Sequence, residues 1–223
     1  MLNNNRRRQR MVAQQLVRRG VRDPGVLSAM REVPREAFVA KRLQAFAYDD
    51  APVPIKDGQT LSQPYVVAWM IAAAAMRPGE RVLEVGAGSG YAAAVMSRIV
   101  DRVYAIERHD GLAKLAAARL RHLGYTNVEV HTGDGTRGWP SAAPFDAIVV
   151  SAGGPTIPPT LKDQLAIGGR LVIPVGDTPH QQCLLKVTRL GMTTFEQDSL
   201  GAVRFVPLIG EQGWSEADAP DLE

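Results

Sequence analysis

The 223-residue sequence contains a single cysteine, Cys183, which excludes a disulfide within the chain. Scarce cysteine is typical of proteins in a reducing compartment, so we expect a cytoplasmic location. Cys183 stands in the apolar run CLLKV, and we expect it to be a small, buried core residue. Long apolar runs are also missing, because the longest candidate, residues 66–76, is too short to span a bilayer. We therefore expect no membrane segment.

The sequence also lacks the common motifs of metal and nucleophilic catalysis. H-E-x-x-H, C-x-x-C and G-x-S-x-G do not occur, and the four histidines are scattered at His109, His122, His131 and His180. We therefore expect no metal centre and no catalytic triad. These absences leave room for chemistry in which the protein orients reactants that need no general base.

Charge is nearly balanced overall, with 26 Lys and Arg against 23 Asp and Glu, but it is unevenly distributed. Residues 1–35 hold nine arginines and two acids, whereas residues 211–223 hold five acids and no base. No aromatic side chain is interleaved with the arginines, which favours a solvated helix face over a nucleic-acid surface. The acidic stretch 211–223 has the composition of a disordered, solvating tail.

The order of apolar segments indicates one domain over residues 1–210, in two parts. Residues 1–78 have a helical pattern, with Asp23 as a predicted helix cap, and they contain a long irregular stretch at 48–64. From residue 79 onward, strand-like and helix-like segments alternate. Strands are expected at 81–85, 102–107, 128–134, 145–153 and 168–176, and helices at 91–98, 111–123 and 158–165.

Such alternation is typical of parallel strands joined by crossover helices. The last segments are separated by short turns and predict antiparallel strands at 181–190, 192–200 and 202–210. The expected fold is therefore α/β, with a doubly wound sheet that is mostly parallel and has antiparallel C-terminal strands. A helical cap precedes this sheet at the N-terminus.

Between the first expected strand and its helix, the sequence LEVGAGSGY is rich in glycine. The spacing is G-x-G-x-G, which differs from the G-x-G-x-x-G of dinucleotide-binding turns. Such a turn lets a ligand approach the backbone closely, because no Cβ intervenes. An acid just before the turn would repel a phosphate. We therefore predict a ligand without phosphate at this turn, bound by Glu84, Gly86, Gly88 and Gly90.

Two further strand ends indicate an adenosine ligand. Glu107 ends the expected strand 102–107, where a doubly wound sheet places an acid beside the ribose. A carboxylate can accept hydrogen bonds from both ribose hydroxyls. Asp134 and Gly135 follow the next expected strand, and a short polar side chain there can contact the adenine amino group. Three loops thus converge on one adenosine-shaped crevice.

With these features, the sequence resembles the Rossmann-like methyltransferases that depend on S-adenosylmethionine (SAM), and more closely the protein-L-isoaspartate O-methyltransferase family. The resemblance covers about residues 11–210. Its most specific stretches are GQTLSQP at 58–64 and RFVPLIG at 204–210. Further stretches that carry it are VPREAFV, YDDAPVPI, VLEVGAGSGY, GDGTRGWP, APFDAIVVSAG and LVIPVG. It implies a Rossmann-like methyltransferase core at 79–210, preceded by a helical part and a substrate loop within 1–78.

Two positions depart from the family pattern. Leu61 stands where the family carries Ile or Val, a change that we expect to be harmless. The segment SAGGP at 151–155 replaces Thr-Ala-Ala-x-Pro, and we expect its glycines to loosen a loop near the substrate. Substrate fit is therefore where this chain is most expected to differ from the family.

The resemblance implies methyl transfer from SAM to the α-carboxylate of an L-isoaspartyl residue in a damaged protein or peptide, followed by closure to a succinimide. By resemblance, Ser62 is the catalytic residue and donates a hydrogen bond to that carboxylate. The implied substrate-binding residues are Thr60, Ser62, Val206, Pro207 and Leu208. Without the resemblance, Ser62 or Gln63 is more simply explained as the N-cap of a helix that starts at Pro64.

Four alternatives remain open. An NAD-dependent oxidoreductase could share the sheet, although the glycine spacing disfavours it. A nucleic-acid methyltransferase could use the basic N-terminus, but no N-P-P-Y motif follows residues 145–153. The chain could also be a non-catalytic relative that binds modified peptide, or a SAM-dependent O-methyltransferase dedicated to one aspartate of a maturing peptide. The expected partners are isoaspartyl proteins and peptides, with no nucleic acid and no membrane, and we expect a monomer.

Overall fold

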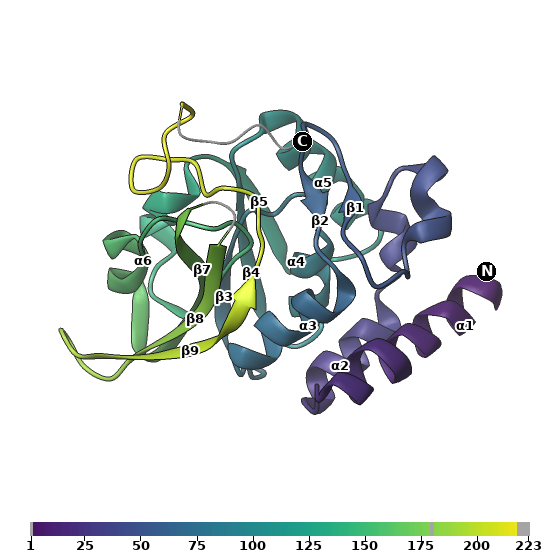
Figure 1. Ribbon diagram of the computed structural model, residues 1–223, viewed down its shortest axis with the longest axis horizontal. Coiled ribbons are helices and arrows are strands. Elements are labelled where there is room, and N and C mark those ends of the chain that lie inside the picture. The colour runs from purple at the N-terminus through teal and green to yellow at the C-terminus, as the bar shows by residue number, and fades with distance from the viewer. Residues whose placement is uncertain (1, 179–180, 218–223) are drawn as a thin grey trace.

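The computed structural model describes residues 2–178 and 181–217, and within them a seven-stranded sheet lies at the centre (Figure 1). The strand order is β5-β4-β3-β6-β7-β8-β9. The strands that pair in parallel are β3 (Arg81–Val85), β4 (Arg102–Glu107), β5 (Val128–Thr132), β6 (Phe145–Val150) and β7 (Leu165–Thr178). The last two strands pair antiparallel, β8 (Gln181–Arg189) with β7 and β9 (Phe195–Val203) with β8. This arrangement confirms the expected α/β fold with antiparallel C-terminal strands.

Alternating side chains bury both faces of the sheet. In β6, Ala147 and Val149 belong to one apolar cluster, whereas Ile148 and Val150 belong to a second. The first cluster is covered by α4 (Tyr91–Met96) and α5 (Asp110–His122), the crossovers that follow β3 and β4. The second is covered by α6 (Pro159–Asp163), which lies on the other side of the sheet in Figure 1. Helices on both faces make the sheet doubly wound, as predicted.

The N-terminal helices form the expected cap. The first helix, α1 (Leu2–Met11), continues through a π-helical turn, η1 (Val12–Leu16), and a 3-10 turn, η2 (Val17–Arg19). The next helix, α2 (Pro24–Glu32), begins as predicted, because the Asp23 carboxylate accepts a hydrogen bond from the Val26 N–H at 2.9 Å. Two 3-10 turns follow, η3 (Arg35–Phe38) and η4 (Lys41–Phe46).

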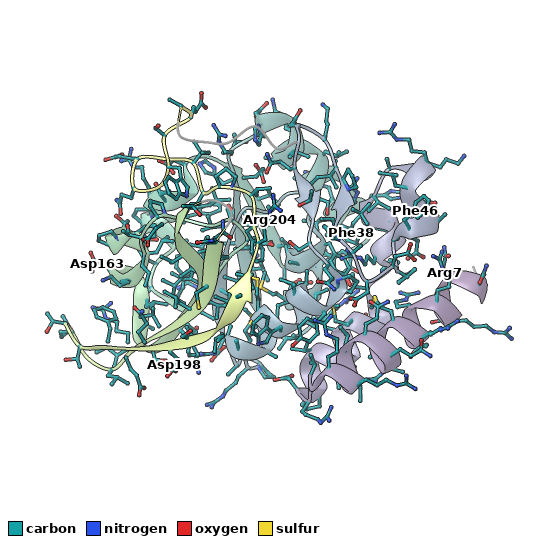
Figure 2. All side chains as sticks on the ribbon, in the orientation of Figure 1. Arg7, Phe38, Phe46, Asp163, Asp198 and Arg204 are labelled. Carbon is teal, nitrogen blue, oxygen red and sulfur yellow. The ribbon has the colours of Figure 1, made fainter. Side chains whose placement is uncertain are left out.

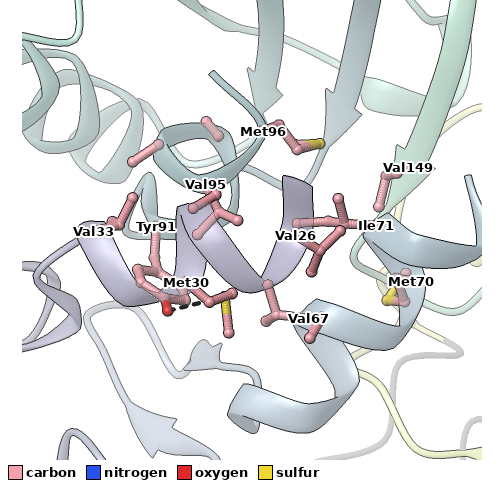
Figure 3. Close-up of a cluster of buried hydrophobic side chains, with 14 of the residues drawn as sticks. Val26, Met30, Val33, Val67, Met70, Ile71, Tyr91, Val95, Met96 and Val149 are labelled. Atoms are coloured by element: carbon pink, nitrogen blue, oxygen red, sulfur yellow. Dashed lines mark hydrogen bonds between the residues drawn. The ribbon is translucent and has the colours of Figure 1, made fainter. Parts of the chain in front are cut away.

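Figure 3 shows how α2 joins this cap to the core. Val26 and Met30 lie beside Val67 of α3 (Pro64–Ala73), and the Tyr91 hydroxyl donates a hydrogen bond to Met30 Sδ at 3.3 Å (Figure 3). These residues share one apolar cluster with the sheet and with side chains of the loop between η4 and α3. The cap therefore fixes that loop against the core. That loop carries a small hairpin formed by β1 (Val53–Pro54) and β2 (Thr60–Leu61).

The segment after β8 differs from the prediction. Instead of separate strands at 192–200 and 202–210, the structure has one strand, β9, which ends at Val203. Residues 204–214 then run irregularly, held by isolated pairings of Pro207 with Gly153 and of Ile209 with Trp214. Proline has no N–H to donate to a strand ladder, so Pro207 does not extend a sheet. The expected strand at 202–210 is therefore wrong.

Two smaller predictions also need correction. Residues 211–217 of the predicted disordered tail are held by defined contacts, such as the bond from Trp214 Nε1 to the Gly153 carbonyl at 3.0 Å. Residues 218–223 lie outside the described residues, as does His180. Cys183 is half-buried rather than buried, because alternation along β8 turns Gln182 and Leu184 into the core instead.

No helix in the ranges 2–178 and 181–217 is long and apolar enough to cross a membrane. The same ranges contain no group of three or more His, Cys, Asp or Glu side chains that could hold a metal ion.

Candidate active site

A cavity opens at the carboxyl ends of β3, β4 and β6, where the strand order reverses. The loops that leave neighbouring strands diverge at such a point and leave a crevice between them. Two walls of this cavity differ in origin. We call residues 84–92 the glycine wall, and residues 59–62 together with 206–209 the loop wall. The lining also includes residues 106–108, 135 and 151–152.

The glycine wall includes the turn after β3, where Gly86 has a φ of 87° and Gly88 a φ of 53°. The N–H groups of Gly86 and Ala87 donate to the Ile106 carbonyl at 2.8 and 3.0 Å, which fixes the turn against β4. Gly86 and Gly88 line the cavity, but Gly90 does not. A Cβ on Gly90 would lie 3.2 Å from a side-chain methyl of α5, so this glycine allows α4 and α5 to pack. The structure therefore gives Gly90 a packing role, and its predicted contact with the ligand stays a prediction.

Glu107 is held at the carboxyl end of β4 and is 4% exposed. Its Oε2 accepts a hydrogen bond from the Gly88 N–H at 2.8 Å, and its Oε1 accepts one from the His109 N–H at 3.0 Å. Each carboxylate oxygen can accept a second hydrogen bond. The group is thus fixed in position and still able to bind a diol in the cavity, which is the geometry that ribose binding requires.

Glu84 lines the same wall and is 1% exposed, and its Oε2 has no hydrogen-bond partner among the described residues. Burial raises the pKa of its carboxyl group well above the usual value, and the Glu107 carboxylate raises it further. The Ala93 backbone N–H lowers this pKa in part. A buried carboxyl oxygen without a partner fits a ligand that brings positive charge, as the sulfonium and ammonium groups of SAM do.

Ser62 lies in the loop wall, and a buried arginine fixes its backbone. Arg35 is fully buried; its Nη2 donates to the Ser62 carbonyl and its Nε to the Ala47 carbonyl, both at 2.7 Å. Its guanidinium carbon lies 4.8 Å from the centre of the Tyr91 ring in the glycine wall. Burial lowers the pKa of Arg35, and its Nη1 has no hydrogen-bond partner in the described part of the chain. Arg35 therefore connects the two walls.

The alternative explanation of Ser62 as a helix cap does not hold. Gln63 occupies the N-cap position of α3, and no side chain caps this helix. Gln63 Nε2 instead donates to the Asp50 carbonyl at 3.1 Å. Ser62 lines the cavity, in company with the other predicted substrate-binding residues, Thr60, Val206, Pro207 and Leu208.

The second half of the loop wall is held by residues far away in the sequence. The Gly153 N–H donates to the Val206 carbonyl, and the Leu208 N–H donates to the Gly153 carbonyl, both at 2.8 Å. A Cβ on Gly153 would lie 2.3 Å from Gln182 Nε2, so close packing requires this glycine. The expectation that the glycines of 151–155 loosen the loop is wrong, because Gly153 is the anchor of the loop wall.

Asp134 does not line the cavity, in contrast to the prediction. Its Oδ1 accepts hydrogen bonds from the Thr136 N–H and hydroxyl at 2.9 and 2.7 Å, and its Oδ2 accepts one from the Glu211 N–H at 2.8 Å. The carboxylate thus fastens the segment that follows the loop wall, and its contact with an adenine amino group stays a prediction. Gly135 does line the cavity, and a Cβ there would lie 2.3 Å from Val85 Cγ1.

Ser151, Arg35 and Trp214 are not among the residues predicted from the sequence. Ser151 follows β6 directly, and its place at the carboxyl end of a strand beside β3 is a usable signal. No local signal marks Arg35 or Trp214, because their partners Ser62 and Gly153 are distant in the sequence.

Comparison with known proteins agrees with this geometry. The family model described as protein-L-isoaspartate(D-aspartate) O-methyltransferase (PCMT) matches residues 6–213. Protein-L-isoaspartate O-methyltransferase 1 of Rhodopseudomonas palustris (strain HaA2) is 60% identical over 208 residues. That match covers 93% of this chain and 85% of the relative.

Two solved structures are similar over most of the chain. A protein-L-isoaspartate O-methyltransferase has a TM-score of 0.84 and 29% identity, covering 92% of this chain and 67% of its own. A structure from Plasmodium falciparum, assigned to the same activity and solved with S-adenosyl-L-homocysteine, has a TM-score of 0.78 and 26% identity, covering 91% and 98%. The chain therefore belongs to the protein-L-isoaspartate O-methyltransferase family, the SAM-dependent enzymes that repair proteins by methylating isoaspartyl residues.

Proposed function

We propose that this chain methylates the α-carboxylate of L-isoaspartyl residues by orienting the reactants, with Ser62 as the catalytic contact. The position of Ser62 carries this proposal. Arg35 ties the Ser62 backbone, and Ser62 lines a cavity whose other wall holds Glu84. The site suited to a cationic methyl donor and the site suited to an anionic acceptor thus share one cavity.

The chemistry requires little from the protein beyond alignment. A carboxylate has a pKa of about 4 and is ionised at neutral pH, so it attacks without a general base. When bound, SAM supplies a methyl group that its sulfonium already activates. The chain's contribution is to hold the attacking oxygen in line with that methyl group and to keep competing water away.

On the cofactor side, each role follows from a position in the cavity. Glu107 accepts hydrogen bonds from the ribose hydroxyls, and Glu84 balances the positive charge of the donor. Gly86 and Gly88 let the cofactor approach the backbone, since neither carries a Cβ. Gly135 serves in the same way at the end of β5, where it also packs against Val85.

On the substrate side, the Ser62 hydroxyl donates a hydrogen bond to the isoaspartyl carboxylate. Helix α3 begins two residues later, and the partial positive charge of its first turn favours an anion. Thr60, the Val206 N–H and the Pro207 carbonyl offer main-chain groups to an extended peptide, whereas the Val206 carbonyl and the Leu208 N–H are paired with Gly153. Recognition through the main chain supports methylation of many flanking sequences.

The same proposal includes one domain over residues 1–210, a monomer, a cytoplasmic location and no nucleic-acid partner. One of the two apolar clusters contains residues from Met11 to Phe205, which supports one domain. Two N-terminal arginines donate hydrogen bonds within the chain, Arg7 to the Ala45 carbonyl and Arg8 to the Glu32 carbonyl. Cations engaged in this way are less available to a phosphate backbone.

The test is transfer of a labelled methyl group from SAM to peptide pairs that differ only in an isoaspartyl or an aspartyl linkage, in several unrelated sequences. We expect methylation of the isoaspartyl member of each pair and none of the aspartyl member. Methylation of one sequence alone would instead indicate an enzyme dedicated to one maturing peptide. Binding of isoaspartyl peptide without turnover would indicate a non-catalytic relative, and either result contradicts the proposal.

A further inference from the structure

A second cavity opens beside the loop wall, and its lining shares four residues with the first, namely Thr60, Ser62, Ser151 and Val206. Its volume is about 650 Å³. Ser62 lies at the junction of the two cavities. We call this second space the flanking cavity, and it has room for the neighbours of an isoaspartyl residue whose carboxylate meets Ser62.

One side of the flanking cavity is an aromatic surface on α3. Tyr65 and Trp69, one helical turn apart, stack with ring centres 5.9 Å apart and an angle of 26° between the ring planes. The indole edge lies against β9, where a Cβ on Gly201 would be 3.4 Å from Trp69 Cη2. The strand pairing is irregular here, and Gly201 has a φ of 141°, so β9 makes room for the indole. Trp69 is thus held between a ring and a backbone.

Arg19 extends this surface from the N-terminal cap. Its guanidinium carbon lies 3.5 Å from the centre of the Tyr65 ring, and its Nη1 pairs with Asp50 Oδ2 at 3.1 Å. The arginine braces Tyr65 through a cation–π contact, and Asp50 already matches its charge.

Charge in the flanking cavity has one sign. Its described lining residues include Arg19 and Arg204, and no Asp or Glu. Arg204 follows the end of β9 and is labelled in Figure 2. A lysine next to the isoaspartyl residue therefore meets no carboxylate in this lining. An aromatic side chain can pack against the exposed part of the Tyr65–Trp69 pair, and contacts between aromatic rings are favourable at centre distances of roughly 4.5–7 Å.

We propose that Tyr65 and Trp69 form a subsite for an aromatic side chain next to the isoaspartyl residue. The proposal rests on the proposed function and deepens it, because it names a class of preferred substrate. Main-chain contacts with the loop wall accept any sequence, and the aromatic subsite then ranks sequences by the side chain they place in the flanking cavity. Trp69 is the residue that sets this preference.

The test uses the full-length protein and isoaspartyl hexapeptides that carry Phe, Ala or Lys immediately before or immediately after the isoaspartyl residue. At one of the two positions, we expect kcat/KM for the Phe peptide to exceed that for the Ala peptide by at least about fivefold, from stacking and burial. In Trp69→Ala this ratio should fall below about twofold. Because it is a ratio within one preparation, it does not depend on the fraction of folded variant. Phe46→Ala removes an exposed ring on η4 and should keep the full ratio.

A Phe-to-Ala ratio near one in the wild type, or a ratio that Trp69→Ala leaves unchanged, would overturn the subsite. Methylation of the Ala peptides would in that case still uphold the proposed function. Failure to methylate any isoaspartyl peptide would overturn the proposed function, and the subsite with it. If Trp69→Ala yields no folded protein, as judged by calorimetry of SAM binding, Trp69→Leu and Tyr65→Leu take its place and must show the same loss of ratio.

Discussion

The glycine wall and the loop wall face one cavity, but they are built differently. The glycine wall is one continuous segment, 84–92, fixed by backbone hydrogen bonds to the adjacent strand. The loop wall joins two distant segments, 59–62 and 206–209, and depends on side-chain contacts from Arg35 and Trp214. With the roles proposed above, cofactor recognition depends on the sheet, whereas substrate recognition depends on the packing around it. A substitution can thus damage one function and spare the other.

Arg35→Met should give the largest difference between the two walls, because it should lower peptide turnover far more than SAM affinity. The variant leaves the carbonyls of Ser62 and Ala47 without their donors, and a hydrogen bond from a charged donor contributes about 1.5–3 kcal/mol. We expect kcat/KM for an isoaspartyl peptide to fall by about 100-fold or more. The dissociation constant of SAM, measured by calorimetry, should change by less than about threefold.

Arg35→Lys is the control, because it keeps a buried cation that can reach one carbonyl and should recover part of the lost turnover. Urea unfolding of both variants separates loss of alignment from loss of stability. Equal losses of peptide turnover and SAM affinity in Arg35→Met would show that the walls cannot be perturbed separately.

Glu107→Ala tests the glycine wall in turn. It removes the acceptor that we assign to the ribose, so SAM affinity should fall by about 30-fold. Glu129→Ala is a matched control, since it removes an exposed carboxylate on the neighbouring strand β5 that pairs with Arg102. Calorimetry with SAM measures both variants. Full affinity in Glu107→Ala would refute the ribose assignment.

Glu84→Gln should lower the SAM affinity of the glycine wall and raise the stability of the fold. Because burial raises the pKa of Glu84, the folded protein holds this proton more tightly than the unfolded chain does. The resulting stability is present at low pH and is lost as the pH rises from the unfolded pKa toward the raised folded pKa. At pH 8, Glu84→Gln should therefore have a higher unfolding midpoint than the wild type and about tenfold lower SAM affinity.

Proton release gives a second readout for the same residue. A cation placed beside the Glu84 carboxylate lowers its pKa, so SAM binding should release protons at pH values below the raised pKa. Calorimetry in two buffers of different ionisation enthalpy measures this release. Release that persists in Glu84→Gln would mean that Glu84 does not face the donor's positive charge.

Trp214→Phe should have the smallest effect, and it should change only the peptide binding that we assign to the loop wall. It removes the hydrogen bond from the indole to the Gly153 carbonyl but keeps a ring in place. A neutral hydrogen bond contributes roughly 0.5–1.5 kcal/mol, so KM for an isoaspartyl peptide should rise about threefold with kcat unchanged. Trp139→Phe loses a comparable bond to Ser141 outside the cavity, and steady-state kinetics should show no change for it.

Much of the glycine wall could be predicted from the sequence, because its determinants are local. Gly86 and Gly88 sit in a strand-to-helix turn, and Glu107 is the last residue of its strand. What an added Cβ would meet depends on elements distant in the sequence, so the sequence could not distinguish Gly90 from Gly86 and Gly88. Gly90 faces α5, a helix that packs from elsewhere in the chain.

The loop wall could be named only through family resemblance. Its residues are placed by pairs such as Arg35 with Ser62 and Gly153 with Val206, which no periodicity or spacing reveals. A free carboxylate and one engaged by a backbone N–H look alike in a sequence. The sequence therefore did not show that the Asp134 oxygens hold the segment that follows the loop wall.

The most direct test of alignment by Ser62 is the Ser62→Ala variant, measured for both ligands. Loss of a hydrogen bond to the charged isoaspartyl carboxylate should lower kcat/KM for an isoaspartyl peptide by about 10- to 100-fold. The dissociation constant of SAM should stay within about twofold of the wild-type value. Unchanged peptide turnover, or a loss of SAM affinity as large as the loss of turnover, would contradict the assignment of Ser62 to the substrate.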